Sequence, residues 1–569
     1  MDSSSPDLHR AKNILNLPPE ILRMVFAYLG DNEYKQSISL TCFEFYSLAL
    51  QSRYESISIE FDVRGFKWKP FASSLLLEPV RGQKRYPKAL RFIPSQAFEE
   101  KRKDSKYTVK DLKRSFARRG NICFDAVKSI TFLNPKFCLD YTQRHGAAKE
   151  IFDDSFAGLA FEVLKRFPNL VNLTIPITHA ILTRKVRIGK TRNASKNREK
   201  NGILANSKLR YLCCLVSLPR KEFSAVWELI RSNSNTLKFL RIFFLFWSPE
   251  ICALSGEIKV PYLFTLDEYL SKLSTLFTIR EYFPPGMPPA RLSLKALQFE
   301  SFPCCGSLQC SNLFRPDVLE VLSLVYCHDA YAMLCDTSVK LVSLRCLQVV
   351  EIKSDVSMLE RSLSQLRPLE GLYISIIQKD EEFDYRCLEK HKGSIKRLVF
   401  LTGEKAISRG DSHLKLRSSS PRTIKPDFRE WQKLEELTFH CGEPLPAFYI
   451  PPCLKFLSVV GASAGVENST NSDYELARGY ASQQIMTAEG GERRLMAIIF
   501  NERLSLPNDI GYHFKIFEIF TEKTGESSGR YISTPIVKIL GADDFLRKFP
   551  ATSILRPSRK ARTWIDAFI

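Results

Sequence analysis

The residue types that could carry out chemistry in this chain are cysteine, histidine and serine. A zinc site would need Cys-x-x-Cys or paired histidine spacings, and a nucleophilic serine would need a Gly-x-Ser-x-Gly turn between a strand and a helix. The clustered cysteines, Cys213-Cys214 and Cys304-Cys305 with Cys310, lack the zinc spacing. The run Gly461-Ala-Ser-Ala-Gly465 indicates a simple turn. We therefore expect no catalytic residue, no metal site and no cofactor, in a chain that is not itself an enzyme.

The composition is that of a large, basic, globular protein. The 569 residues are 44% apolar, and 83 Lys and Arg against 62 Asp and Glu give a formal net charge of +21. Such an excess favours an acidic partner but does not specify the fold. The start of the sequence lacks the apolar segment of a secretory signal, and the 15 cysteines are scattered as in proteins that keep their thiols reduced. We expect a cytoplasmic and/or nuclear protein that does not contact a membrane.

Part of the positive charge is concentrated in one stretch. Between Arg184 and Arg210 the chain carries ten basic residues and the single acid Glu199, with Gly, Asn and Ser between them. This composition predicts a solvated loop, inserted at about 184–208. Nuclear localisation or contact with nucleic acid stays an alternative. The stretch has no interleaved aromatic residues, which disfavours binding of single strands.

The elements that must position any functional residue begin near the N-terminus. Pro18 suits the first turn of a helix, and Glu20 suits the positive end of the helix dipole. Apolar residues then recur at spacings of three and four over 21–29, and a second apolar set covers 40–49. Short helices of this kind cannot bury so much apolar surface among themselves, so some of it is expected to contact a partner.

This pattern resembles an F-box of the fungal type. The opening Leu17-Pro18-Pro-Glu-Ile-Leu22 and the later run 40–49 carry the resemblance, which covers residues 14–57. In that family three helices dock on a Skp-type adaptor, which links them to a cullin and a RING subunit. Phe43 and Glu44 stand where the family usually has basic residues, so apolar burial must dominate docking here. The resemblance implies adaptor contacts from Leu17, Pro18, Ile21, Leu22, Val25, Leu29, Cys42, Phe45 and Tyr46.

A short pattern of two aliphatic residues three positions apart recurs after residue 120. Copies that begin at Leu294, Leu319, Leu344, Leu369 and Ile395 are separated by 25, 25, 25 and 26 residues. This period lies in the range of leucine-rich repeats, and the pattern resembles the repeats that follow an F-box in one group of that family. It predicts a degenerate solenoid of parallel strands that bury their leucines by stacking. An ordinary α/β domain with buried parallel strands is the alternative.

Successive side chains of a strand point to opposite faces of the sheet. If the repeated leucines face the core, the residues between them line the concave face of the solenoid. Polar residues on such a face suit selective binding of a protein substrate. The candidate substrate-facing residues are Gln298, Glu300, Gln348, Tyr373, Arg397, Glu436, His440 and Ser458.

The last hundred residues depart from the repeat. The segment 461–494 is rich in small and polar residues and predicts a mobile loop, and Leu495–Phe500, Tyr512–Phe520 and Tyr531–Leu540 have the pattern of strands that could cap a solenoid. The expected fold class is therefore α/β (α+β). The expected domains are a flexible tail (1–13), an F-box (14–57), a basic linker with first helices (58–120), the solenoid (121–460), the mobile loop (461–494) and a β-rich C-terminal cap (495–569).

The resemblance implies a substrate-recognition adaptor of a Skp–cullin–F-box ubiquitin ligase. Its expected partners are a Skp-type adaptor, through it a cullin–RING ligase, and a protein substrate that the sequence does not identify. Two alternatives remain, a scaffold that binds the adaptor without recruiting a cullin and a basic repeat protein that binds nucleic acid. Nucleic acid is the less favoured partner.

Overall fold

The structure of the chain is a computed structural model. It describes residues 21–22, 56–62, 65–69, 129–133, 169–177, 208–216, 226, 229–244, 291–300, 314–325, 327, 330–353, 356–378, 383–402, 427–440, 450–460, 470–487, 495–503, 512–525, 531–549 and 552. The chain divides into two compact units. The first comprises Met1–Cys213 with Glu228–Thr236, and the second comprises Cys214–Trp227 with Leu237–Ile569.

The first unit contains a small mixed sheet. Strand β1 (Ser56–Asp62) pairs antiparallel with β2 (Gly65–Lys69) and parallel with β3 (Ser129–Leu133), and β3 pairs parallel with β4 (Asn172–Ile177). Strands β1 and β2 lie where a linker with helices was expected, so that expectation was wrong for these residues. The run Ser-Ile-Ser-Ile-Glu-Phe in β1 alternates polar and apolar residues with period two, which is the pattern of a strand.

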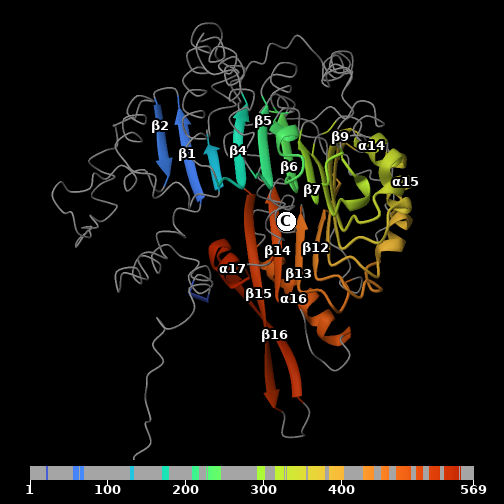
Figure 1. The fold of residues 1–569 in the computed structure, drawn as a ribbon. Coiled ribbons are helices and arrows are strands. Elements are labelled where there is room, and N and C mark those ends of the chain that lie inside the picture. Colours follow the sequence, from blue (N-terminus) through green and yellow to red (C-terminus); the bar gives the residue numbers. More distant parts are fainter. Residues whose placement is uncertain are drawn as a thin grey trace, which may run out of the picture. The chain divides into compact units, whose positions relative to one another are not determined.

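The second unit is built on a long sheet of mostly parallel strands (Figure 1). Its strands follow one another in chain order from β6 to β16, and neighbours in sequence are neighbours in the sheet. The pairs from β6 to β14 are parallel, and β14, β15 and β16 are antiparallel. The strands are β6 (Phe239–Phe244), β7 (Ala296–Glu300), β8 (Val321–Val325), β9 (Cys346–Lys353), β10 (Gly371–Gln378), β11 (Arg397–Thr402), β12 (Glu436–His440), β13 (Phe456–Val460), β14 (Ala497–Arg503), β15 (Tyr512–Gly525) and β16 (Tyr531–Leu540). One further strand, β5 (Tyr211–Val216), has residues in both units.

Helices are fewer than strands in the described part of the chain. Figure 1 shows α14 and α15 side by side next to β9, and α17 beside β14 and β15. The helices and 3-10 turns are η5 (Pro316–Val318), α14 (Ala330–Thr337), η6 (Ser338–Lys340), α15 (Val356–Gln365), η7 (Tyr385–His391), α16 (Thr470–Thr487) and α17 (Ala542–Lys548). None of these described helices is long and apolar enough to cross a membrane. The expected mixed α/β class with a long parallel sheet is confirmed at this level.

The 25-residue period of the sequence is the register of the sheet. Leu297, Leu322, Leu347, Leu372 and Leu398 are paired in turn across β7 to β11, and each is at most 1% exposed. One period therefore carries the chain from one strand to the equivalent position of the next. Because every leucine in the row packs beside its neighbours, a single strand could not bury its own leucine alone.

The sheet of the second unit has two faces with different neighbours. Leu347 shares its face with Phe400, whose ring lies 5.0 Å from that of Phe383 and 5.1 Å from that of Tyr385 in η7. We call this side, with α14, α15 and η7, the Leu347 face. The opposite side carries a buried cluster of residues that alternate with the leucines, and we call it the Cys346 face. This cluster comprises Ala296, Val321, Val325, Cys346, Val350, Tyr373 and Val399.

The segment expected to be a mobile loop, 461–494, contains an 18-residue helix instead. Helix α16 buries Ala477, Tyr480 and Ala481, which follow one another at helical spacing, and Tyr474 packs its ring 6.5 Å from that of Phe517. The small and polar composition concealed this stripe, because Ala contributes little to an apolar pattern although it is the best helix former. The three strands expected after residue 494 are confirmed as β14, β15 and β16.

Candidate functional site

Two residues of the expected adaptor-binding set are described. Ile21 and Leu22 are helical, and their side chains differ in exposure, with Ile21 42% exposed and Leu22 5% exposed. Of the two, Ile21 is accessible and Leu22 is buried within the chain. The other members of the set lie outside the described residues, namely Leu17, Pro18, Val25, Leu29, Cys42, Phe45 and Tyr46.

The structure brings most of the candidate substrate-facing residues together on the Cys346 face. Gln298, Ser323, Gln348 and Tyr373 are paired in register across β7 to β10, and Thr438 and Ser458 are paired further along on β12 and β13. Glu300 lies two positions beyond Gln298 on the same face, and Arg397 and Glu436 are paired at the start of β11 and β12. His440 is the last residue of β12, and its side chain is outside the described set.

The exposure of these side chains differs from the expectation. Six of the eight are buried, and Arg397 keeps 23% of its side chain exposed. The polar row is bordered by the apolar cluster of the Cys346 face, against which Phe239 and Leu401 also pack. Alternation placed these residues on the correct face, but the face is a covered, mostly apolar surface. The six buried residues are Gln298, Glu300, Gln348, Tyr373, Glu436 and Ser458.

The charged groups on this face occur in pairs. Arg241 Nη2 lies 3.6 Å from Glu300 Oε2, and Arg397 Nε lies 3.5 Å from Glu436 Oε1. A carboxylate buried as deeply as Glu300, which has no exposed side-chain surface, needs such a partner to stay charged. In these two pairs each described carboxylate faces one guanidinium, so their charges balance.

The face also carries neutral polar side chains. Ser323 Oγ donates to Gln348 Oε1 over 2.8 Å in a fully buried position. Gln298 Nε2 and Thr438 Oγ1 are buried without a hydrogen-bond partner among the groups that the structure describes. Burial raises the pKa of the Cys346 thiol to about 12, so this cysteine is an inert apolar group rather than a nucleophile.

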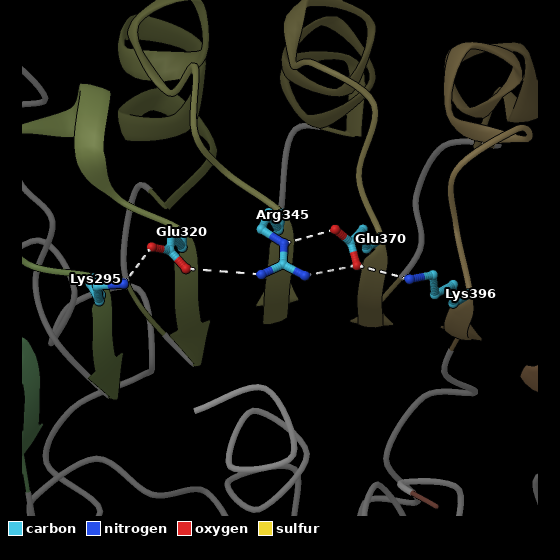
Figure 2. A network of polar contacts seen from close by, with 5 residues as sticks. All are labelled: Lys295, Glu320, Arg345, Glu370 and Lys396. Carbon is cyan, nitrogen blue, oxygen red and sulfur yellow. Dashed lines mark hydrogen bonds and ion pairs between the residues drawn. The ribbon is translucent and has the colours of Figure 1, made fainter.

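Alternating charges form a second polar array, on the residues that precede each strand (Figure 2). Lys295 Nζ lies 3.0 Å from Glu320 Oε1, and Arg345 reaches Glu320 at 4.0 Å on one side and Glu370 at 2.7 Å on the other. Lys396 Nζ completes the array at 3.3 Å from Glu370 Oε2. We call these five residues the charge ladder. Its side chains are partly exposed, so it forms a surface strip in which three cations alternate with two carboxylates.

The backbone explains the regular spacing of the charge ladder. The N–H of each member from Glu320 to Lys396 donates to the carbonyl of the member before it, over 2.7 to 2.9 Å. Glu370 sits between two cations, and the hydrogen bond from Arg345 is the main cause that lowers its pKa to about 2. Sequence reasoning missed the charge ladder, although its signal was present in charges of alternating sign at the 25-residue period.

Two other kinds of described side chain could take part in chemistry, histidine and cysteine, and their surroundings indicate structural roles. His391 is buried between α15 and the start of β10, where its Nδ1 accepts from the N–H of Leu369 at 3.2 Å and its Nε2 lies 3.0 Å from the carbonyl of Leu363. The described cysteines are free thiols, and no group of three or more potential metal ligands occurs among the described residues.

No family model matches this chain, and a search of curated proteins finds no match either.

Proposed function

We propose that this chain is the substrate-recognition subunit of a Skp–cullin–F-box type ubiquitin ligase. The observation that carries the proposal is the N-terminal sequence, in which Leu17–Leu29 and the run 40–49 have the residue types and separation of an F-box. The regular register of the parallel sheet supports the second half of the proposal, a solenoid of degenerate leucine-rich repeats after the F-box.

In this proposal the chain itself carries out no chemical step. The F-box docks the Skp-type adaptor, and the sheet of the second unit binds a protein substrate. The conjugating enzyme is then carried by the other subunits, so the contribution of this chain to the rate is proximity and orientation. The inert Cys346 and the paired carboxylates of the Cys346 face are compatible with a binding surface.

The energetics of adaptor docking follow from the apolar residues of the F-box. Burying five or six large apolar side chains contributes about 1.5–3 kcal/mol each, which offsets the cost of association and leaves a stable complex. Phe43 and Glu44 stand where F-boxes usually have basic residues, so part of the electrostatic attraction between F-box and adaptor is absent. Adaptor binding should therefore depend only weakly on salt concentration.

Co-expression with a Skp-type adaptor and size-exclusion chromatography test the proposal. We expect a stoichiometric complex that is lost when residues 1–60 are removed. The matched control is Val339→Ser, a change at a 71% exposed position of the second unit, which should leave the complex intact. Failure of the full chain to bind the adaptor, or retention of the complex by the truncated chain, would contradict the proposal.

A further inference from the structure

One edge of the sheet in the second unit carries an excess of positive charge. The parallel strands β7 to β13 all begin at this edge. We call the described residues of the turns that lead into these strands the amino edge, namely 291–295, 315–320, 338–345, 365–370, 389–396, 427–435 and 450–455. They contain 12 Lys and Arg against seven Asp and Glu, and the charge ladder lies among them (Figure 2). The formal charge of the amino edge is therefore +5.

The alternation of charge continues past the charge ladder along this edge. The N–H of Glu435 donates to the carbonyl of Lys396 over 2.8 Å, and the N–H of Lys455 donates to that of Glu435 over 2.9 Å. Lys455 Nζ also lies 3.0 Å from Glu435 Oε1. Within the charge ladder the cations are more exposed than the anions, with Arg345 at 57% and Glu370 at 32%. The amino edge therefore presents a positive group to solvent at every second strand.

Ion pairing leaves cations rather than carboxylates available at the amino edge. Each of its seven carboxylates pairs with a lysine or an arginine. Four of its exposed cations form no ion pair that the structure describes, namely Arg291, Lys340, Arg367 and Lys433. These four side chains can therefore pair with carboxylates of another molecule without first breaking an ion pair of this one.

The four unpaired cations are spread over a length that a short extended peptide can follow. Arg291 and Lys340 lie in the turns before β7 and β9, and Arg367 and Lys433 lie in those before β10 and β12. Five strand spacings of about 4.8 Å separate β7 from β12, which amounts to about 24 Å. A peptide of about eight residues covers this distance at about 3.3 Å per residue.

The carboxylates of the charge ladder favour an acidic peptide over a nucleic acid as the partner. Glu320 and Glu370 keep 34% and 32% of their side chains exposed and lie between the cations. They would repel a nucleic acid, whose backbone carries a negative charge on every phosphate. A peptide can place acidic side chains on the cations and can donate its backbone N–H groups to the carboxylates between them. The mixed charge of the amino edge therefore fits a polypeptide.

We propose that the amino edge binds an acidic protein segment in an extended conformation. Its carboxylates pair with Arg291, Lys340, Arg367 and Lys433. That this segment belongs to the substrate rests on the function proposed above. An incoming protein can reach this exposed edge directly, whereas most candidate residues on the Cys346 face are buried. Because the contributing charges are exposed, the affinity falls as the salt concentration rises.

Fluorescence anisotropy with the full chain tests the proposal. The probe is a fluorescein-labelled peptide of about eight residues with Glu at alternate positions, and the matched probe has Gln in place of every Glu. We expect the acidic peptide to bind at low salt. The variant Lys340→Gln with Arg367→Gln should raise its dissociation constant about tenfold, because two exposed ion pairs are lost. The control Arg478→Gln with Lys538→Gln removes the same charge at exposed positions of α16 and β16 and should have little effect.

Several outcomes would overturn the proposal. Equal weakening in the two variants would attribute binding to the net charge of the whole chain, and equal binding of the Gln peptide would show that carboxylates are not recognised. Failure of the wild type to bind the acidic peptide would exclude the site. A short DNA duplex that binds more tightly than the peptide and is weakened by Lys340→Gln with Arg367→Gln would assign the amino edge to nucleic acid instead. No adaptor is present in this assay, so its failure is distinct from failure of the adaptor complex.

Discussion

The guanidinium of Arg345, just before β9, donates two hydrogen bonds to the carboxylate of Glu370, just before β10, Nε to Oε1 over 2.7 Å and Nη2 to Oε2 over 3.0 Å. The two residues are 25 positions apart and are joined by their backbones as well, because the N–H of Glu370 donates to the carbonyl of Arg345. The ion pair therefore depends on the register between β9 and β10. Bidentate geometry makes it stronger than a usual surface pair.

Replacing Glu370 with Gln should lower the free energy of unfolding by about 0.5–1 kcal/mol at pH 7, a figure that allows for the partial exposure of the pair. The pKa of Glu370 is lowered in the folded state, so its stabilising effect is complete above the usual carboxyl pKa and is lost as the pH falls toward about 2. Urea unfolding at pH 7 and at pH 3 should show a smaller difference between wild type and Glu370→Gln at the lower pH.

The control for this prediction is Glu389→Gln. Glu389 also forms an ion pair, with Lys392 at 3.2 Å, but 63% of its side chain is exposed and it bridges no strands. This change should move the urea midpoint very little. Equal effects of the two substitutions would mean that the charge ladder adds nothing beyond an ordinary surface pair.

His391 should make the protein less stable in mild acid. Its Nδ1 accepts a hydrogen bond from Leu369, so the proton is on Nε2 and points to the carbonyl of Leu363. Burial is the main cause that lowers the pKa of His391. The unfolded chain therefore binds a proton before the folded chain does, and stability falls as the pH drops below about 6.5, the usual value.

The variant His391→Gln distinguishes the loss of stability caused by protonation of His391 from that caused by protonation of other groups. The glutamine amide can replace part of the hydrogen bonding but cannot be protonated. We expect His391→Gln to be less stable than wild type at pH 7.5, with a gap that narrows by up to about 1 kcal/mol at pH 5.5. Thermal or urea unfolding at the two pH values measures the gap. A gap of constant size would show that folding does not lower the pKa of His391.

The buried hydrogen bond between Ser323 and Gln348 should be worth more than its exposed counterparts. Ser323→Ala removes a partner of Gln348 in a position without solvent, which costs about 1–2 kcal/mol. The double change Ser323→Ala with Gln348→Leu should cost less than the sum of the single changes, since no buried amide is then left with a partner missing. Ser364→Ala is the control, because that hydroxyl donates to Glu360 in an exposed position and its loss should be nearly neutral.

The sequence predicted the parallel strands well where one period held. Leu297, Leu322, Leu347 and Leu372 are 25 residues apart and share one row of the sheet. Alternation also assigned Gln348 and Tyr373 to the correct face. Apolar periodicity predicts these strands because each strand buries one leucine at the same register position of the sheet.

The same reasoning failed where burial depends on what lies over a face. Alternation distinguishes the two sides of a strand, but it does not say whether a second layer covers either side, so Gln348 was expected to be open and is buried. It failed for α16 because Ala477 and Ala481 form a stripe of small residues. It also missed the charge ladder, since the charges of Glu320 and Arg345 were considered singly rather than at the repeat period.

The proposed contact of Leu17 and Pro18 with the adaptor can be tested by substitution. The double substitution Leu17→Ala with Pro18→Ala removes apolar surface at the proposed docking site, at a cost of about 2–4 kcal/mol of binding free energy, or a loss of affinity of at least about thirtyfold. We expect the adaptor no longer to co-purify. The pH-dependent stability assigned to His391 should be unchanged, because that residue belongs to the second unit. An adaptor that still co-purifies in full amount would refute the assignment of Leu17 and Pro18, and loss of binding together with loss of the His391 signature would indicate general unfolding instead.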